Sequence, residues 1–203
     1  MENENWLYSD RVKEHFINPR NILLNDQEFD YHARGMVGNV MCGDQMVMYI
    51  KVDPEKLTIT DCKWKTYGCA SAIASTSVLS EMVKGMTLEK AYSLTPKDIL
   101  RELGGLPDRK IHCSVLGDKA LRAAIDDYYM KHGMSDKVKT DLKSKLICEC
   151  QQINQEDIEE AVLEGVRNFK QLQEKTKIST GCGKCEPEAK EILKKYINKY
   201  FSD

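Results

Sequence analysis

The spacing of its cysteines is the feature of this 203-residue chain that most constrains its fold. The chain holds eight cysteines, at Cys42, Cys62, Cys69, Cys113, Cys148, Cys150, Cys182 and Cys185. The first four stand singly, whereas the last four form two tight pairs. The N-terminus shows no secretory signal pattern, so we expect a cytoplasmic protein whose reduced thiols bind metal or do redox chemistry. The spacing therefore predicts two different sulfur sites.

The two pairs near the C-terminus predict a four-thiolate metal site. Cys148-x-Cys150 and Cys182-x-x-Cys185 are separated by 31 residues and meet if the helices between them fold back as a hairpin. Four thiolates suit zinc or an iron–sulfur cluster, and the spacing does not choose between these metals. A segment of under 60 residues also needs such a staple. The alternative is two pairs of structural free thiols.

The first site is predicted from single residues at loops and element ends. Cys42 lies in a glycine-bounded loop just before Asp44, Cys69 precedes a small-residue helix, and His112-Cys113 opens another helix. A helix N-terminus favours a thiolate, and three thiolates with nitrogen or oxygen ligands make an open site that can gain and lose metal. The alternatives are an aspartate that only turns its loop and a buried cysteine beside a surface histidine.

Hydrophobic periodicity predicts an α+β fold. Alternation indicates strands at 45–52 and 57–67, with Cys62 as a packed structural side chain in the second strand. We expect a loop at 18–34, a glycine-containing site loop at 35–44, and helices over about 10–17, 70–83, 87–92, 96–103 and 113–132. The predicted domains are a small antiparallel sheet covered by helices at 1–133, a solvated linker at 134–145, and a small all-helical domain at 146–203.

Composition excludes two classes of partner. The 30 basic and 32 acidic residues give a net charge of -2, which provides no field selecting nucleic acid or an anionic membrane. No apolar run approaches the roughly 20 residues of a membrane span. We therefore expect neither nucleic acid nor membrane as a partner.

Three motifs resemble the scaffold domain of the IscU and NifU family. They are Gly35-Met36-Val37-Gly38 followed by Cys42-Gly43-Asp44, the run Lys65-Thr66-Tyr67-Gly68-Cys69-Ala70-Ser71-Ala72-Ile73-Ala74-Ser75, and Ile111-His112-Cys113-Ser114-Val115-Leu116. Tyr8-Ser9 and Asn18-Pro19-Arg20-Asn21 also match, so that the resemblance spans about residues 6–131.

The resemblance implies a scaffold for iron–sulfur clusters rather than a turnover enzyme. It implies that Cys42, Cys69 and Cys113 hold a transient [2Fe-2S] or [4Fe-4S] cluster, with Asp44 and His112 beside them. Iron and sulfur from a cysteine desulfurase would form the cluster, which then passes to apo-proteins. Our hypothesis is that Cys113 accepts the persulfide sulfur, and homodimerisation is plausible for NifU-like proteins.

The C-terminal segment resembles the bacterioferritin-associated-ferredoxin-type (BFD-like) domain at the centre of NifU. Thr180-Gly181-Cys182-Gly183 carries this likeness together with the two cysteine pairs. It implies that Cys148, Cys150, Cys182 and Cys185 bind a permanent [2Fe-2S] cluster.

Two departures from the family and two alternatives remain. The chain ends at Asp203 without the third domain of a full-length NifU, so we expect no cluster delivery through that domain. Residues Leu106–Lys110 depart from the chaperone-recognition motif Leu-Pro-Pro-Val-Lys, which argues against dependence on a dedicated Hsp70. One alternative is a zinc-dependent sulfur acceptor of the SufU type, although the 43 residues between Cys69 and Cys113 contain no obvious extra loop. The other is a [2Fe-2S] electron carrier.

Overall fold

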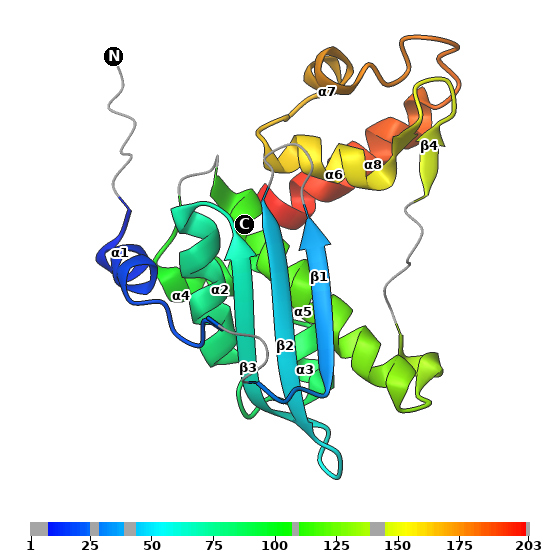
Figure 1. Ribbon diagram of the computed structural model, residues 1–203. Helices are drawn as coiled ribbons and strands as arrows, with labels where there is room; N and C mark the ends of the chain where they lie inside the picture. Colours follow the sequence, from blue (N-terminus) through cyan, green and yellow to red (C-terminus); the bar gives the residue numbers. More distant parts are fainter. Residues whose placement is uncertain (1–7, 25–28, 39–43, 107–109, 139–144, 202–203) are drawn as a thin grey trace. The chain divides into compact units, whose positions relative to one another are not determined.

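The chain forms two compact units, Met1–Thr140 and Asp141–Asp203 (Figure 1). The computed structural model describes residues 8–24, 29–38, 44–106, 110–138 and 145–201, without the side chains of 111–114. No helix within these ranges combines the length and apolar composition needed to cross a membrane.

The first unit is a three-stranded antiparallel sheet with helices packed on one face (Figure 1). The strands β1 (Ala33–Gly38), β2 (Gln45–Asp53) and β3 (Thr58–Tyr67) follow one another in space as in sequence. The helices are α1 (Asp10–Ile17), α2 (Ala70–Met82), α3 (Leu88–Tyr92), α4 (Pro96–Leu103) and α5 (Ile111–Lys131), with a short 3-10 helix at Ser135–Lys137. The predicted α+β class is therefore confirmed.

Strand β1 corrects the sequence analysis, which placed residues 33–38 in loops. Gly35 and Gly38 weaken the alternating pattern that marks a strand. Gly35 is required by packing, because a Cβ there would lie 2.1 Å from the carbonyl oxygen of Ala120 and 2.3 Å from the amide nitrogen of Ala124. The strand is thus specified by its contact with α5, which local periodicity does not reveal.

The core of the first unit lies between the sheet and the helices. Met46, Met48 and Ile50 on β2 are fully buried, as the alternation predicted, and Cys62 and Trp64 on β3 are buried with them. The apolar face of α5 is also buried; its members include Val115, Leu116, Ala120, Leu121, Ala124, Ile125 and Tyr128.

Capping side chains begin three helices of this unit. Ser9 accepts a hydrogen bond from the Val12 amide at the start of α1, and Thr87 caps α3. Thr95 forms a capping box with Asp98 at the start of α4. These local signals fix helix boundaries because they satisfy amide groups that lack partners within the helix.

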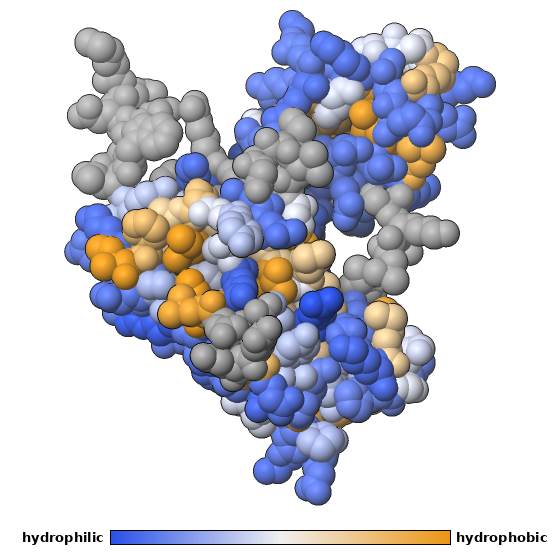
Figure 2. Space-filling model, in the orientation of Figure 1, coloured by the Kyte–Doolittle hydropathy of each residue, from blue (hydrophilic) through white to orange (hydrophobic). Residues whose placement is uncertain are grey.

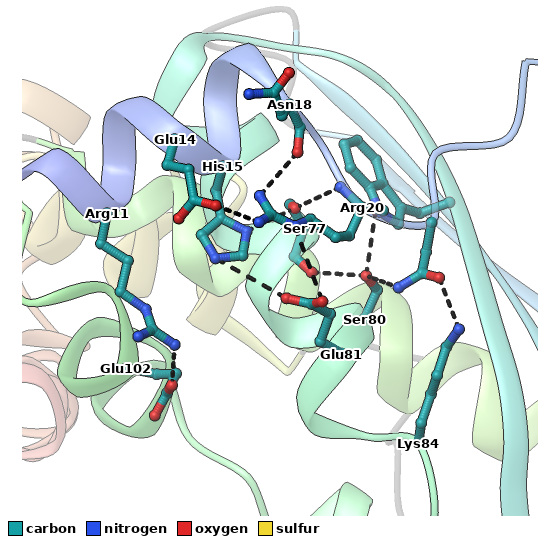
Figure 3. A network of polar contacts seen from close by, with 12 residues as sticks. Arg11, Glu14, His15, Asn18, Arg20, Ser77, Ser80, Glu81, Lys84 and Glu102 are labelled. Atoms are coloured by element: carbon teal, nitrogen blue, oxygen red, sulfur yellow. Dashed lines mark hydrogen bonds and ion pairs between the residues drawn. The ribbon is translucent and has the colours of Figure 1, made fainter.

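A polar network attaches the N-terminal segment to α2 and β3 (Figure 3). His15 is buried, and its Nδ1 lies 2.8 Å from the Ser77 hydroxyl oxygen, which also accepts a bond from the Arg20 amide. The Trp64 indole donates to the Arg20 carbonyl over 2.8 Å. Residues far apart in sequence thus hold α1 and the following loop against the core.

The same network continues to the next turn of α2. The Asn21 side-chain amide donates to the Ser80 hydroxyl over 3.0 Å, and Lys84 donates to Oδ1 of Asn21 over 2.7 Å. Lys84 also pairs with Asp61 of β3 over 2.7 Å. Part of the region predicted as loop, 18–24, is therefore attached to the core, although it has no regular structure of its own.

Apolar side chains also reach the surface of the first unit. Figure 2 shows them in separate patches amid hydrophilic residues. The most exposed large ones that the structure describes are Leu24, Tyr67 and Ile17. Met36 and Tyr67 line an open groove of about 400 Å³ on the sheet with Arg34, Gln45, Val47, Tyr49 and Lys65.

The second unit consists of a short hairpin and three helices. Its elements are β4 (Leu146–Cys148), β5 (Ile153–Asn154), α6 (Gln155–Leu163), α7 (Phe169–Thr176) and α8 (Glu186–Phe201). The unit is helical, as predicted, but it also contains this hairpin, whose strands of three and two residues are too short to show a periodic pattern in the sequence. Asn154 and Asp157 form a capping box at the start of α6.

The segment between the units is packed at its start. Met134 and Val138 contact the hydrophobic core of the first unit, although the sequence analysis placed both in a solvated linker. Residues 139–144 of that linker lie outside the described residues.

Candidate functional site

One end of the sheet gathers several residues of the first predicted site. Gly38 at the end of β1 and Tyr67 at the end of β3 both pair with Gln45 at the start of β2. Asp44 and Gly68 therefore lie next to each other at the end toward which β1 and β3 point in Figure 1. A Cβ on Gly68 would lie 3.2 Å from Oδ2 of Asp44, so the aspartate carboxylate sits against this turn.

Cys69 follows this turn and occupies the N-cap of α2. Its backbone is extended, with φ of -73° and ψ of 169°, and its side chain is half-buried. The first turn of α2 contains no acidic residue. The thiol is therefore held at the positive end of a helix dipole, where negative charge on a thiolate is stabilised.

The direction of α5 brings its first turn to the same end of the sheet. The Arg34 amide donates to Asp127 over 2.9 Å, and Gly35 faces Ala120 and Ala124, so α5 runs antiparallel to β1. From the contact with Gly35, roughly nine residues of helix lead back to Cys113 and span about 14 Å. The part of β1 that runs from Gly35 to the end of the strand spans about 10 Å. The backbone of the first turn of α5 thus reaches the end of β1.

The structure describes the predicted residues of the first site unequally. Asp44 and Cys69 are described completely and lie at one end of the sheet. His112 and Cys113 belong to the first turn of α5, but their side chains lie outside the described part, as does all of Cys42. Pro107, Asp108 and Arg109 in the predicted departure from the chaperone motif also lie outside it.

Cys62 is separate from this site, as predicted. It is fully buried in β3, and burial, followed by the Asp61 charge, raises the pKa of its thiol to about 12. A thiol with this pKa carries almost no thiolate at neutral pH and is a poor nucleophile or metal ligand.

The four cysteines of the second unit lie in two pairs. Cys148 ends β4, and Cys150 follows in the hairpin turn; Cys182 and Cys185 lie in the loop before α8. The sulfurs of Cys150 and Cys182 are 3.3 Å apart, and the Cys185 thiol hydrogen-bonds to Cys148. Among the described residues no three His, Cys, Asp or Glu side chains form a single-ion site.

Backbone amides and neighbouring thiols shift the pKa values of three of these cysteines. Burial acts to raise the pKa of Cys148, but amide hydrogen bonds from Ser179 and Gln151 and the Cys185 thiol lower it overall. The Lys184 amide and the Cys150 thiol lower the pKa of Cys182. The partner thiol in turn raises the pKa of Cys150.

This geometry fits a cluster of two irons. Two thiolates 2.3 Å from one tetrahedral metal ion lie about 3.8 Å apart, slightly farther than the 3.3 Å between Cys150 and Cys182. Each iron of a [2Fe-2S] cluster with four cysteine ligands takes two of them, which matches an arrangement in pairs. The amide donors around Cys148 suit bound thiolate, which accepts hydrogen bonds.

Sequence reasoning missed two residues beside these sulfurs. The Ser179 hydroxyl oxygen lies 2.9 Å from the Cys185 sulfur, and Lys184 contributes both its amide and its charge at Cys182. Lys184 stands inside the C-x2-C motif, so its proximity could have been inferred from spacing. Ser179 lies outside the motif, and only the path of the loop brings its hydroxyl to the sulfur.

Comparisons with known proteins agree with this division of the chain. Residues 7–135 match the model of the NifU-like N-terminal domain, and residues 146–195 match that of the BFD-like [2Fe-2S] binding domain. The nitrogen fixation protein NifU of Nostoc sp. is 38% identical over 197 residues, or 93% of this chain, and the chain spans 64% of the length of that protein.

Shorter relatives match the first unit. The iron–sulfur cluster assembly scaffold protein IscU of Aquifex aeolicus is 51% identical over 126 residues, which cover 62% of this chain and 78% of that protein. The IscU of Haemophilus influenzae is 48% identical over 126 residues, which cover 62% of this chain and 98% of that protein. The chain therefore belongs to the family of the NifU-like N-terminal domain, here combined with a BFD-like [2Fe-2S] binding domain.

Proposed function

We propose that this chain is a scaffold on which iron–sulfur clusters are assembled and from which they pass to apo-proteins. The assembly site lies in the first unit and uses Cys42, Cys69 and Cys113, with Asp44 and His112 beside them. The cluster built there, [2Fe-2S] or [4Fe-4S], is cargo. A cysteine desulfurase is the proposed sulfur donor, and the second unit holds a permanent [2Fe-2S] cluster.

The observation that carries the proposal is the meeting of three element ends at one end of the sheet. The start of β2 brings a carboxylate, the N-cap of α2 brings a thiol, and the first turn of α5 brings the His112-Cys113 backbone. Thiolate together with oxygen and nitrogen ligands binds iron less tightly than four thiolates would. Such a site suits a cargo that must leave again.

Sulfur transfer follows from thiol chemistry. The Cys113 thiolate attacks the outer sulfur of the desulfurase persulfide, so that a new sulfur–sulfur bond forms, the old one breaks and the desulfurase cysteine leaves as thiolate. Two electrons from a one-electron carrier of the ferredoxin class then reduce the transferred sulfur to sulfide and restore the Cys113 thiolate. Iron held by the neighbouring ligands combines with the sulfide.

The second unit offers its four cysteine sulfurs in pairs to a resident cluster. When bound, a [2Fe-2S] cluster would supply one-electron redox chemistry. The hairpin turn and the loop before α8 orient the sulfurs, and amides of Ser179, Gln151 and Lys184 donate to them. The alternative is that these four thiolates bind zinc, and analysis of iron, zinc and sulfide in the purified chain distinguishes the two.

The experiment compares the metal content and spectra of the anaerobically purified chain before and after incubation with iron, cysteine and a cysteine desulfurase. Iron, zinc and sulfide are measured with visible absorption and EPR. We expect an initial [2Fe-2S] signal that survives a chelator, followed by a second, chelator-sensitive cluster. Zinc in the first unit and no new cluster would support the sulfur-acceptor alternative. A stable, reversibly reduced cluster in the first unit would support an electron carrier.

Matched cysteine variants assign the two signals. Replacing Cys113 with Ser should abolish assembly in the first unit and leave the resident signal intact. Cys62→Ala is the control, because this buried thiol lies outside the proposed ligand set and should leave both signals unchanged. Unchanged assembly in Cys113→Ser would remove the sulfur-accepting role from this residue.

A further inference from the structure

Ser179 contacts two of the four sulfurs of the second unit. Its hydroxyl oxygen lies 2.9 Å from the Cys185 sulfur, and its amide donates to Cys148. The side chain is nearly buried, with 8% of the residue exposed. One residue therefore reaches a sulfur of each tight cysteine pair in the sequence.

The backbone of Ser179 is also unusual. Its φ is +58°, in the left-handed region where residues other than glycine are uncommon. The chain thus places a serine, rather than the glycine that this conformation favours, at a turn from which its hydroxyl reaches the Cys185 sulfur. The adjacent Thr180 is exposed and donates its hydroxyl to the Lys177 carbonyl over 2.7 Å.

We propose that Ser179 tunes the reduction potential of the [2Fe-2S] cluster of the second unit by donating hydrogen bonds to the Cys185 and Cys148 sulfurs. This inference rests on the proposed function of that unit. An iron-bound thiolate can only accept, so the serine hydroxyl must be the donor when the cluster is present. Ser179 is thus a positioning and tuning residue and not a ligand.

The direction of the effect follows from charge. Reduction adds one electron to the cluster, and a hydrogen bond to its sulfur stabilises the more negative reduced state more than the oxidised state. The Ser179 hydroxyl therefore raises the potential, and removing it lowers the potential. Near-burial excludes the water that would otherwise replace this donor.

The test uses the full chain with Ser179→Ala and Ser179→Gly, after a chelator has removed labile iron. Potentiometric titration followed by EPR and visible absorption should show a more negative midpoint in both variants. At a fixed applied potential, we expect the ratio of reduced to oxidised cluster to fall about tenfold, or about 59 mV for a one-electron couple. Both variants keep the amide donor, and glycine also relieves the left-handed backbone.

Thr180→Ala is the matched control, because it removes a neighbouring hydroxyl that contacts a carbonyl and no sulfur. Its midpoint should equal that of the unmodified chain. Equal midpoints in Ser179→Ala and the unmodified chain, or an equal shift in Thr180→Ala, would overturn the inference. If both Ser179 variants lose a cluster that Thr180→Ala retains, the residue holds the loop rather than tuning the potential, and the inference is again wrong.

Failure of the inference is distinguishable from failure of the proposed function. Absence of a [2Fe-2S] spectrum in the unmodified chain would overturn the resident cluster and the role of Ser179 together. A normal cluster with unchanged potentials in the variants would overturn only the role of Ser179.

Discussion

The two thiol sites of this chain are built on different kinds of backbone. In the second unit, four cysteines come from one hairpin turn and one loop, and their sulfurs already lie in pairs with amide donors. In the first unit, the proposed site draws on Asp44 just before β2, the N-cap of α2 and the first turn of α5. A site divided among separate element ends loosens when any one of them shifts, whereas a hairpin and a short loop keep their ligands together.

The types of ligand also differ between the two sites. The second site offers only thiolates, which bind iron and zinc tightly, and lowered pKa values of Cys148 and Cys182 favour that form. The proposed first site adds the carboxylate of Asp44, which would be a harder ligand. Geometry and ligand type therefore both support the proposal that the second unit retains its cluster and the first unit passes its cluster on.

The largest expected effect is on the second site. Cys148→Ala should abolish the resident [2Fe-2S] signal and leave the second unit largely unfolded, because metal binding supplies much of the stability of so small a unit. Iron and sulfide analysis, EPR and limited proteolysis measure the result. Assembly on the first unit should continue, and loss of both clusters together would contradict the separation of the two sites.

The next largest effect is on the stability of the first unit. Gly35→Ala should destabilise it by about 3 kcal/mol, because the new Cβ would lie 2.1 Å from the Ala120 carbonyl oxygen. Gly38→Ala is the control, since the nearest atom among the described residues would be the Asp44 carbonyl oxygen, 3.8 Å away. Urea unfolding followed by circular dichroism gives the two free energies. The resident cluster signal should persist in Gly35→Ala, and equal stabilities of the two variants would disprove the contact.

A smaller effect tests the ligand contrast. Asp44→Ala should make the cluster assembled on the first unit more persistent, slowing its loss to a chelator about tenfold, because the harder ligand that weakens binding is removed. The resident cluster serves as an internal control within the same chain. Chelator challenge followed by visible absorption measures both decays. Faster loss in the variant would instead make Asp44 a stabilising ligand.

Much of the fold and the division into two cysteine sites could be predicted from the sequence, because both depend on local signals. Alternation in β2, the caps Ser9 and Thr95, and the cysteine spacing each follow from chemistry within a few residues. Strand β1 and the hairpin of the second unit could not be predicted in this way. The first owes its existence to packing of Gly35 on α5, and the second is too short for a pattern.

Side-chain contacts that depend on the fold also could not be predicted from the sequence. The position of Asp44 against Gly68 depends on strand register, and the contact of Ser179 with Cys185 depends on the path of a loop with a left-handed residue. Periodicity carries no information about either. Conversely, the burial of Cys62 was predictable because alternation assigns each strand residue to one face.

The smallest predicted effect is a pH dependence of stability that differs between the two units. All four histidines precede residue 141, so only the first unit can respond through histidine. Burial, followed by the charge of Arg20, lowers the pKa of His15 below its ordinary value of 6.5, although Glu81 and Glu14 oppose the shift. Below about pH 6.5 the unfolded chain therefore binds more protons than the folded chain, and the stability contributed by neutral His15 is lost as pH falls through its folded pKa.

His15→Gln should reduce this pH dependence and cost about 1 kcal/mol at pH 7.5, because the buried contact with Ser77 is altered. Urea unfolding of the first unit between pH 5 and 7.5 measures both quantities. The second unit, which contains no histidine, should show no histidine-linked slope in that range. An equal slope in His15→Gln and the unmodified chain would assign the pH response to another group. A steeper loss of stability in the second unit would show that the contrast between the two units is not a matter of histidine burial.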